Sequence, residues 1–177
     1  PGIVDLKDAE QRGELVYIPM GGSTLELWTN RLEGLQVPEV HVLDRDVQPP
    51  EPAKYQDAAD RVNARGDNCR SFVTNRREME NYIHFEAINE EFAIQLTENF
   101  CSFDDVPVMV AKAVHDASES TVDWDDLDEK KQGKKESKAK KRLNRGAVSN
   151  MTVARLHSSD PDGEVLTWLG EISRHLR

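Results

Sequence analysis

The fold of this chain is decided at residues 40–46, VHVLDRD, where an apolar run ends in two aspartates. Side chains at positions i and i+2 of a β-strand share a face, so a strand that ends near Leu43 brings Asp44 and Asp46 together. Two carboxylates at such a short distance repel each other unless a cation lies between them. Since no cysteine is nearby, oxygen ligands favour Mg²⁺ or Mn²⁺, and two such ions about 3.5–4 Å apart are typical of phosphoryl transfer. The alternative is a solvated loop after a strand.

Around this strand the sequence alternates between strand-like and helix-like segments. Residues 15–19 (LVYIP) predict a short buried strand, and residues 25–32 predict a helix that ends at Gly34. After the proline-rich residues 48–52, a helix is expected at 54–65 and a further strand at 69–73. This alternation predicts an α/β fold with a parallel sheet flanked by helices.

Ligands of such sheets gather at the carboxyl ends of the strands. Three loops are expected to meet there, namely Gly21-Gly22, Asp44-Arg45-Asp46 and residues 74–77 (TNRR). The pattern therefore predicts one site at one edge of the sheet.

The rest of the chain reads as a helical appendage. Apolar spacing predicts helices over 78–83, 86–100 and 106–118, and a last helix over roughly 163–176. A strongly charged tract, residues 123–145, interrupts them. The C-terminal half is thus expected to contain no further strand.

Charge is unevenly distributed over the 177 residues, whose formal net charge is -10. Residues 123–129 hold five acids, whereas residues 130–145 hold seven Lys, two Arg and one Glu, a local charge of +8. Because screening acts over about 8–10 Å, a basic segment on an acidic body is compatible with phosphate binding. A solvated helix or a floppy connector is the alternative reading.

Several classes of protein are excluded or disfavoured by composition. No apolar run reaches the length of a membrane-spanning helix, so no membrane partner is expected. The two cysteines and five histidines show neither a disulfide framework nor zinc spacing, which favours the cytoplasm. Because the chain starts at Pro1, we expect it to be a piece of a longer protein.

Three ordered segments carry a resemblance to a known family. They are residues 17–22 (YIPMGG), 42–46 (VLDRD) and 77–83 (REMENYI), with a weaker likeness at 133–135 (GKK) and 140–144 (KKRLN). Together they are similar to the Toprim domain of the OLD (overcoming lysogenization defect) family nucleases. The resemblance implies a Toprim-like parallel sheet and a metal-dependent DNA endonuclease or nickase.

The resemblance also assigns roles to residues. Asp44 and Asp46 match the acidic pair that binds metal, and Glu80 matches the acid of the Arg-Glu-x-Glu-Asn segment, with Glu78 as second choice. Lys134 or Lys141 of the basic tract could stabilise phosphate charge in the transition state, and of the two we name Lys141. Glu78 and Glu80 could instead be first-turn acids that complement a helix dipole.

The domain organisation implied is a Toprim core over 1–85 and a helical region over 86–177 that completes the nuclease domain. Family domains begin with a strand that ends in Glu-Gly, and this sequence has none before Leu15. The resemblance further implies an N-terminal ABC-type ATPase domain in the same polypeptide, homo-oligomers through that ATPase part, and a role in phage defence.

Three functions follow from these residues. The leading hypothesis is hydrolysis of DNA phosphodiesters with two Mg²⁺ or Mn²⁺ ions. The alternatives are a catalytically silent Toprim module that binds nucleic acid, and a phosphoacceptor domain like those of response regulators. The last lacks a clear candidate for the lysine that such domains use at a later strand end.

Overall fold

The computed structural model describes residues 5–20, 24–66 and 68–176. By their contacts these residues form two compact units. The first unit holds the described residues of 1–45, 49–74 and 163–177, and the second holds 46–48 and 75–162. The predicted division into 1–85 and 86–177 concerns functional modules and stays a prediction.

The first unit is a small α/β structure. Its strands are β1 and β2, which pair in parallel from Glu39 opposite Cys69 to Leu43 opposite Val73. Its elements are α1 (Leu6–Gln11), α2 (Leu25–Glu33), β1 (Glu39–Leu43), α3 (Gln56–Asn63), β2 (Cys69–Val73) and α8 (Glu164–His175). The predicted α/β class is therefore confirmed, with a two-stranded parallel sheet flanked by helices.

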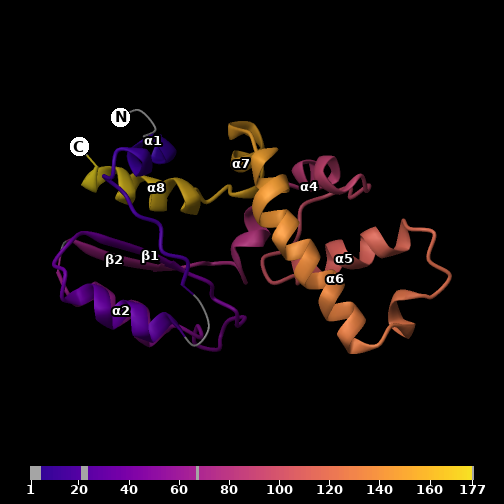
Figure 1. Cartoon of the computed structure of the whole chain (residues 1–177), viewed down its shortest axis with the longest axis horizontal. Helices are drawn as coiled ribbons and strands as arrows, with labels where there is room; N and C mark the ends of the chain where they lie inside the picture. Colours follow the sequence, from indigo (N-terminus) through magenta and orange to yellow (C-terminus); the bar gives the residue numbers. More distant parts are fainter. Residues whose placement is uncertain (1–4, 21–23, 67, 177) are drawn as a thin grey trace. The chain divides into compact units, whose positions relative to one another are not determined.

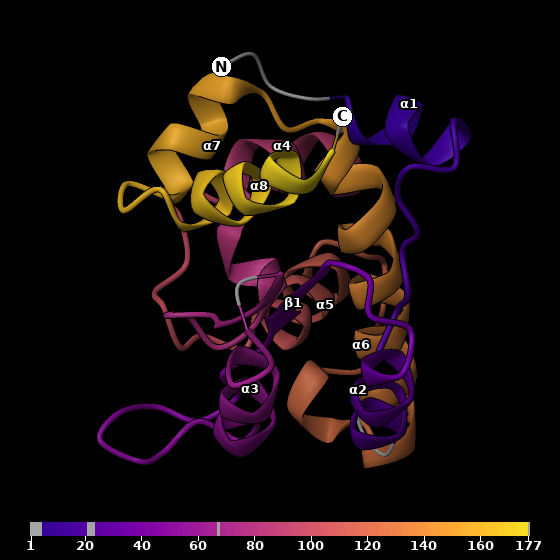
Figure 2. The ribbon, with the colours of Figure 1, turned by 90° about the vertical axis from the view of Figure 1, so that its left-hand side faces the viewer.

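Helices cover both faces of this strand pair. Leu43 of β1 packs with Leu25 of α2 and with Ala58 and Ala59 of α3. Figure 2 shows α2 and α3 on the same side of β1, and Figure 1 shows α8 on the other side of the strands. Successive side chains of β1 point to opposite faces of the sheet. The side chains on one face are buried, and those on the other are half-buried.

The buried face of β1 also carries charge. Glu39 accepts hydrogen bonds from His41 Nε2 at 2.8 Å and from Arg65 Nη1 at 3.1 Å. Glu39 and His41 are both more than nine-tenths buried. A buried carboxylate is tolerated because these partners satisfy it.

The strand predicted at residues 15–19 is wrong. The chain has no regular secondary structure there, and Val16 and Tyr17 expose 74% and 51% of their surface. A strand needs a hydrogen-bonded neighbour, which an apolar sequence alone does not supply. The parallel crossover consequently runs from β1 through α3 to β2, and the predicted crossover through α2 is not formed among the described residues.

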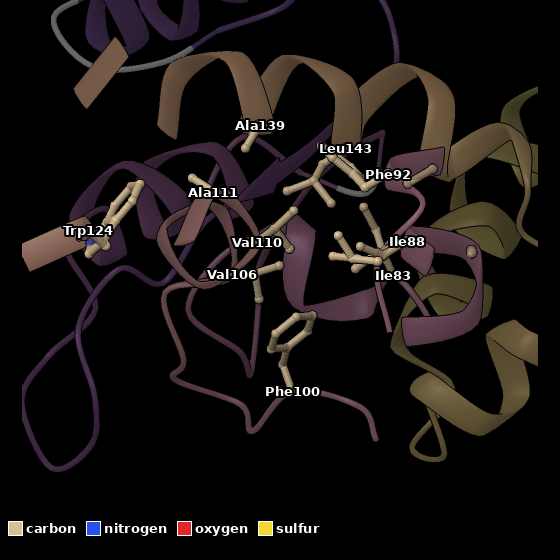
Figure 3. Packing of buried hydrophobic residues seen from close by; sticks show 13 residues of the cluster. Ile83, Ile88, Phe92, Phe100, Val106, Val110, Ala111, Trp124, Ala139 and Leu143 are labelled. Atoms are coloured by element: carbon tan, nitrogen blue, oxygen red, sulfur yellow. The ribbon is translucent and has the colours of Figure 1, made fainter. Parts of the chain in front are cut away.

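The second unit is helical. It contains η2 (Met79–Tyr82), α4 (Phe85–Phe92), α5 (Val106–Asp116), η3 (Trp124–Asp126), α6 (Glu129–Arg142), η4 (Leu143–Ala147) and α7 (Val153–Ser159). Of these, η2 and η3 are 3₁₀-helices and η4 is a π-helical turn. Figure 3 shows Ala139 and Leu143 of α6 and η4 directed at the apolar side chains of α4 and α5.

Most predicted helices of this half are confirmed. Helix α5 begins after Asp105, whose carboxylate accepts from the backbone N–H of Val108 at 3.3 Å. The helix expected over 86–100 ends at Phe92, because Ala93 is left-handed with φ of 54°. The charged tract forms the ordered helix α6 and its approach, which excludes the floppy connector for residues 129–142.

No helix in the described part of the chain is both long and apolar enough to cross a membrane.

Candidate functional site

The loop that follows β1 is fastened to the end of β2. The backbone N–H of Thr74 donates to the carbonyl of Leu43 at 2.9 Å, and the N–H of Arg45 donates to Thr74 Oγ1 at 3.0 Å. Thr74 is completely buried. Asp44 therefore lies at a rigid carboxyl end of the sheet, as the sequence predicts.

Asp46 leaves the extended conformation. Its φ is 61°, in the left-handed region that costs a non-glycine residue about 1 kcal/mol, and its N–H donates to the carbonyl of Arg77 at 2.9 Å. The alternation of an extended strand thus stops before Asp46, which belongs to the second unit whereas Asp44 belongs to the first. Gly21 and Gly22, predicted to border the same site, lie outside the described residues.

Glu78 and Glu80 are held by the short helix η2. Asn81 Oδ1 accepts from the N–H of Glu78 at 3.2 Å, which closes a capping box. Its Nδ2 donates to the carbonyls of Cys101 at 3.0 Å and Asp104 at 3.1 Å. Asn81 is 2% exposed and satisfied on both ends, so it fixes the two carboxylates on a rigid turn.

The two arginines before η2 strengthen this turn. Arg76 Nη1 donates to the carbonyl of Asn81 at 2.7 Å, and its guanidinium lies 4.8 Å from the ring centre of Tyr82. Arg77 Nη2 lies 2.6 Å from Asp105 Oδ2. These contacts tie the residues before η2 to Asn81 within the turn and to Asp105 at the start of α5.

A lysine from α6 meets both carboxylates. Lys140 Nζ lies 2.5 Å from Glu78 Oε2 and 3.5 Å from Glu80 Oε1. Asn144, in the π-helical turn η4, donates from Nδ2 to Glu80 Oε1 at 2.6 Å. We call Glu78, Glu80, Lys140 and Asn144 the carboxylate cluster.

Burial makes this cluster electrostatically unusual. The Glu80 side chain is 2% exposed and that of Glu78 is 10% exposed. Burial raises the pKa of Glu78, and the nearby charge of Glu80 raises it further, while the hydrogen bond from Lys140 lowers it. Perturbed carboxyl groups of this kind concentrate at functional sites.

The residue that contacts the carboxylates is Lys140, which the sequence prediction did not choose. Lys141 is exposed, and its proposed catalytic role stays a prediction. The missed signal is helical phase: Lys140 directly follows the buried Ala139 and precedes the buried Leu143 by three positions, so it borders the packed face of α6. Asn144 was missed because its contact depends on the π-helical turn, which no spacing rule predicts.

The donor chemistry of the cluster suits a hard cation. Carboxylate oxygens are the ligands that Mg²⁺ and Mn²⁺ prefer, and Glu78 and Glu80 supply them on one turn. Within residues 5–20, 24–66 and 68–176, no three His, Cys, Asp or Glu side chains form a group that could hold a metal ion. In this arrangement the ammonium of Lys140 supplies the positive charge between the carboxylates.

Comparisons of the chain with protein-family models, with curated proteins and with solved structures found no match. The family likeness therefore rests on the motif segments themselves.

Proposed function

We propose that this chain is a Toprim-like domain of the OLD type that hydrolyses DNA phosphodiesters with Mg²⁺ or Mn²⁺. One observation carries the proposal. The segments 77–83 and 140–144 were both singled out by the resemblance, and they meet at Glu78 and Glu80 although about sixty residues separate them. These two segments lie far apart in the chain but contribute to one buried polar cluster. That shared cluster supports a common chemical role for them.

The roles follow from the chemistry of each group. Glu78 and Glu80 would hold a metal ion on η2 of the second unit. Asp44 and Asp46 stay the metal ligands proposed after β1. Such an ion, when bound, lowers the pKa of a coordinated water and neutralises phosphate charge. Lys140 holds a positive charge against the two carboxylates and, once displaced from them, can donate a hydrogen bond to a phosphate oxygen.

Two further observations support this assignment. Burial raises the pKa of Glu78, and carboxyl groups perturbed in this way concentrate at functional sites. The left-handed backbone of Asp46 is a local strain of the kind that persists where neighbouring contacts enforce it, often at functional sites. The two-ion stoichiometry, the ATPase domain in the same polypeptide, oligomers through it, the cytoplasmic location and the role in phage defence are parts of the same proposal.

A second candidate is a catalytically silent module that binds nucleic acid. It is favoured by one specific feature, namely that Lys140 and Asn144 already satisfy Glu78 and Glu80. A carboxylate pair that is neutralised by protein groups can serve as a structural lock instead of a metal ligand set.

Cleavage of supercoiled and linear DNA by the full chain with Mg²⁺ or Mn²⁺ separates the two candidates. Nuclease activity that is lost in Asp44→Ala and kept in Asp125→Ala, an exposed acid outside the site, supports the enzyme. Thermal melts of both variants show whether each has folded. DNA binding by the wild type without any cleavage supports the silent module, and cleavage by a folded Asp44→Ala protein overturns the site.

A further inference from the structure

Helix α6 has one face that is built of lysine. At about 100° per residue, Lys130, Lys134, Lys138 and Lys141 lie within about 80° of arc on the helix. All four side chains are exposed, and none makes an ion pair or hydrogen bond with another described residue. We call these four residues the lysine face.

The rest of the helix shows that this face is segregated from acids. Both acids of α6, Glu129 and Glu136, fall on the opposite half of the helix, together with the buried Ala139. Lys140 also falls outside the lysine face, where it reaches Glu78. A helix whose charges serve only solubility usually carries acidic and basic residues on the same face. The separation of the four lysines from both acids of α6 therefore indicates an anionic partner.

Three other cations of the helix, Lys131, Lys140 and Arg142, have partners within the protein. Lys131 Nζ lies 3.0 Å from Asp128 Oδ2. Arg142 Nε donates to Glu91 Oε1 at 2.8 Å, and its guanidinium lies 4.2 Å from the ring centre of Phe92. The cations of α6 that remain for a partner are therefore the lysine face and the neighbouring Lys135, which is also exposed.

We propose that the lysine face binds the phosphate backbone of duplex DNA without reading its sequence. With a rise of about 1.5 Å per residue, the face extends about 16 Å from Lys130 to Lys141. One strand of B-form DNA places about five phosphates along that length, so four lysines match it in charge.

The composition of the face selects among nucleic acids. Proteins that bind single strands stack bases on aromatic side chains, and α6 contains no aromatic residue. Base reading in grooves relies on Asn, Gln and Arg, whereas the one Gln of the helix, Gln132, donates to the carbonyl of Trp124 at 3.0 Å. A face of lysines alone makes backbone contacts, which fits a duplex of any sequence.

This inference rests on the proposed function only in taking DNA as the partner, and its test does not depend on cleavage. Binding of a fluorescein-labelled duplex is followed by anisotropy in EDTA, over salt from about 50 to about 200 mM. The test variant replaces Lys130, Lys134, Lys138 and Lys141 by Gln, which keeps helix propensity. One matched variant replaces the same four by Arg, and another neutralises Lys7, Arg31, Arg61 and Arg70, which lie outside α6 and are also exposed.

We expect the Gln variant to bind at least about tenfold more weakly at low salt, with a log–log salt slope shallower by about 0.9 for each lost contact. The Arg variant and the distant variant should bind as the wild type does. Circular dichroism confirms that α6 persists.

An unchanged salt slope in the Gln variant overturns the inference, and so does an equal loss in the distant variant. Tighter binding of a single strand, of an RNA duplex or of anionic vesicles than of duplex DNA also overturns it. If the lysine face binds duplex DNA but the protein does not cleave it, the inference holds and the nuclease proposal is refuted. If the protein cleaves DNA but the Gln variant keeps the wild-type salt slope, the nuclease proposal holds and the inference is overturned.

Discussion

Lys140 Nζ lies 2.5 Å from Oε2 of Glu78, which precedes it by 62 positions in the chain. The lysine side chain is 45% exposed, whereas that of Glu78 is 10% exposed. The pair therefore joins a solvent-accessible cation to a mostly buried carboxylate. The predictions below test what this pair and its neighbours contribute.

Replacing Lys140 by Met should lower nuclease activity by about 10²–10³-fold, because a cation that can stabilise phosphate charge is removed. The pKa of Glu78 should rise further, since the hydrogen bond from Lys140 lowers it. The free energy of unfolding should fall by no more than about 1–2 kcal/mol. The loss is small because water already screens the partly exposed ammonium. Lys112→Met, which removes an exposed lysine paired with Asp116 on α5, is the control for cleavage rates and melts. Wild-type cleavage by Lys140→Met would remove this lysine from the mechanism.

Glu80→Gln separates a metal ligand from a structural acid. Glutamine keeps the oxygen that accepts from Asn144, so the fold should lose no more than about 1 kcal/mol. Cleavage should nevertheless disappear, because the neutral amide is a poor ligand for Mg²⁺ compared with a carboxylate. Cleavage rates with Mg²⁺ and Mn²⁺, measured together with the free energy of unfolding in urea, show whether Glu80 is a metal ligand or a structural acid. If Glu80→Gln cleaves normally, Glu80 is a structural partner of Asn144 and is not a metal ligand.

His84 should make the stability of the second unit depend on pH. Its Nδ1 accepts from the N–H of Glu86 at 3.2 Å at the start of α4, which requires the neutral ring. Burial lowers the pKa of His84, so its contribution to stability is fully present above the ordinary imidazole pKa and is lost as the pH falls through the lowered value. His84→Asn, which keeps a cap, should flatten this dependence, and His84→Ala should cost about 0.5–2 kcal/mol at neutral pH.

The free energy of unfolding, measured by denaturant titration across a pH series, checks this prediction. His157→Asn on α7, an exposed histidine, is the matched control and should keep the wild-type slope. An unaltered slope in His84→Asn would assign the pH dependence to other groups.

Two glycines of the same helical segment should respond in opposite ways to alanine. A Cβ at Gly146 would overlap the carboxylate of Glu91, which is paired with Arg142, so Gly146→Ala should destabilise by about 1–3 kcal/mol. A Cβ at Gly133 in α6 meets nothing within 4 Å, so Gly133→Ala should stabilise by up to about 1 kcal/mol. Thermal melts of both variants test this pair.

A double-mutant cycle identifies the cause at Gly146. If the overlap with Glu91 is responsible, Glu91→Ala should relieve most of the loss in Gly146→Ala. Simple additivity of the two losses would contradict that explanation.

The strands at 39–43 and 69–73 and the helices at 106–116 and 164–175 were predictable from sequence. Their signals are local: β-branched and aromatic runs, a capping aspartate at Asp105 and apolar residues at helical spacing. The candidate carboxylates Glu78 and Glu80 were named from the family resemblance of residues 77–83, and their role stays a prediction.

Only the tertiary structure decided which residues meet. The apolar residues 15–19 did not become a strand, because a strand exists through hydrogen bonds to a neighbour that the local sequence does not specify. Likewise, Lys140 among seven lysines was selected by the packing of α6 on α5, and Asn144 by the π-helical turn that follows it. Local propensity determines which elements form, but contacts between distant segments depend on how buried faces pack, and that information is spread over the whole chain.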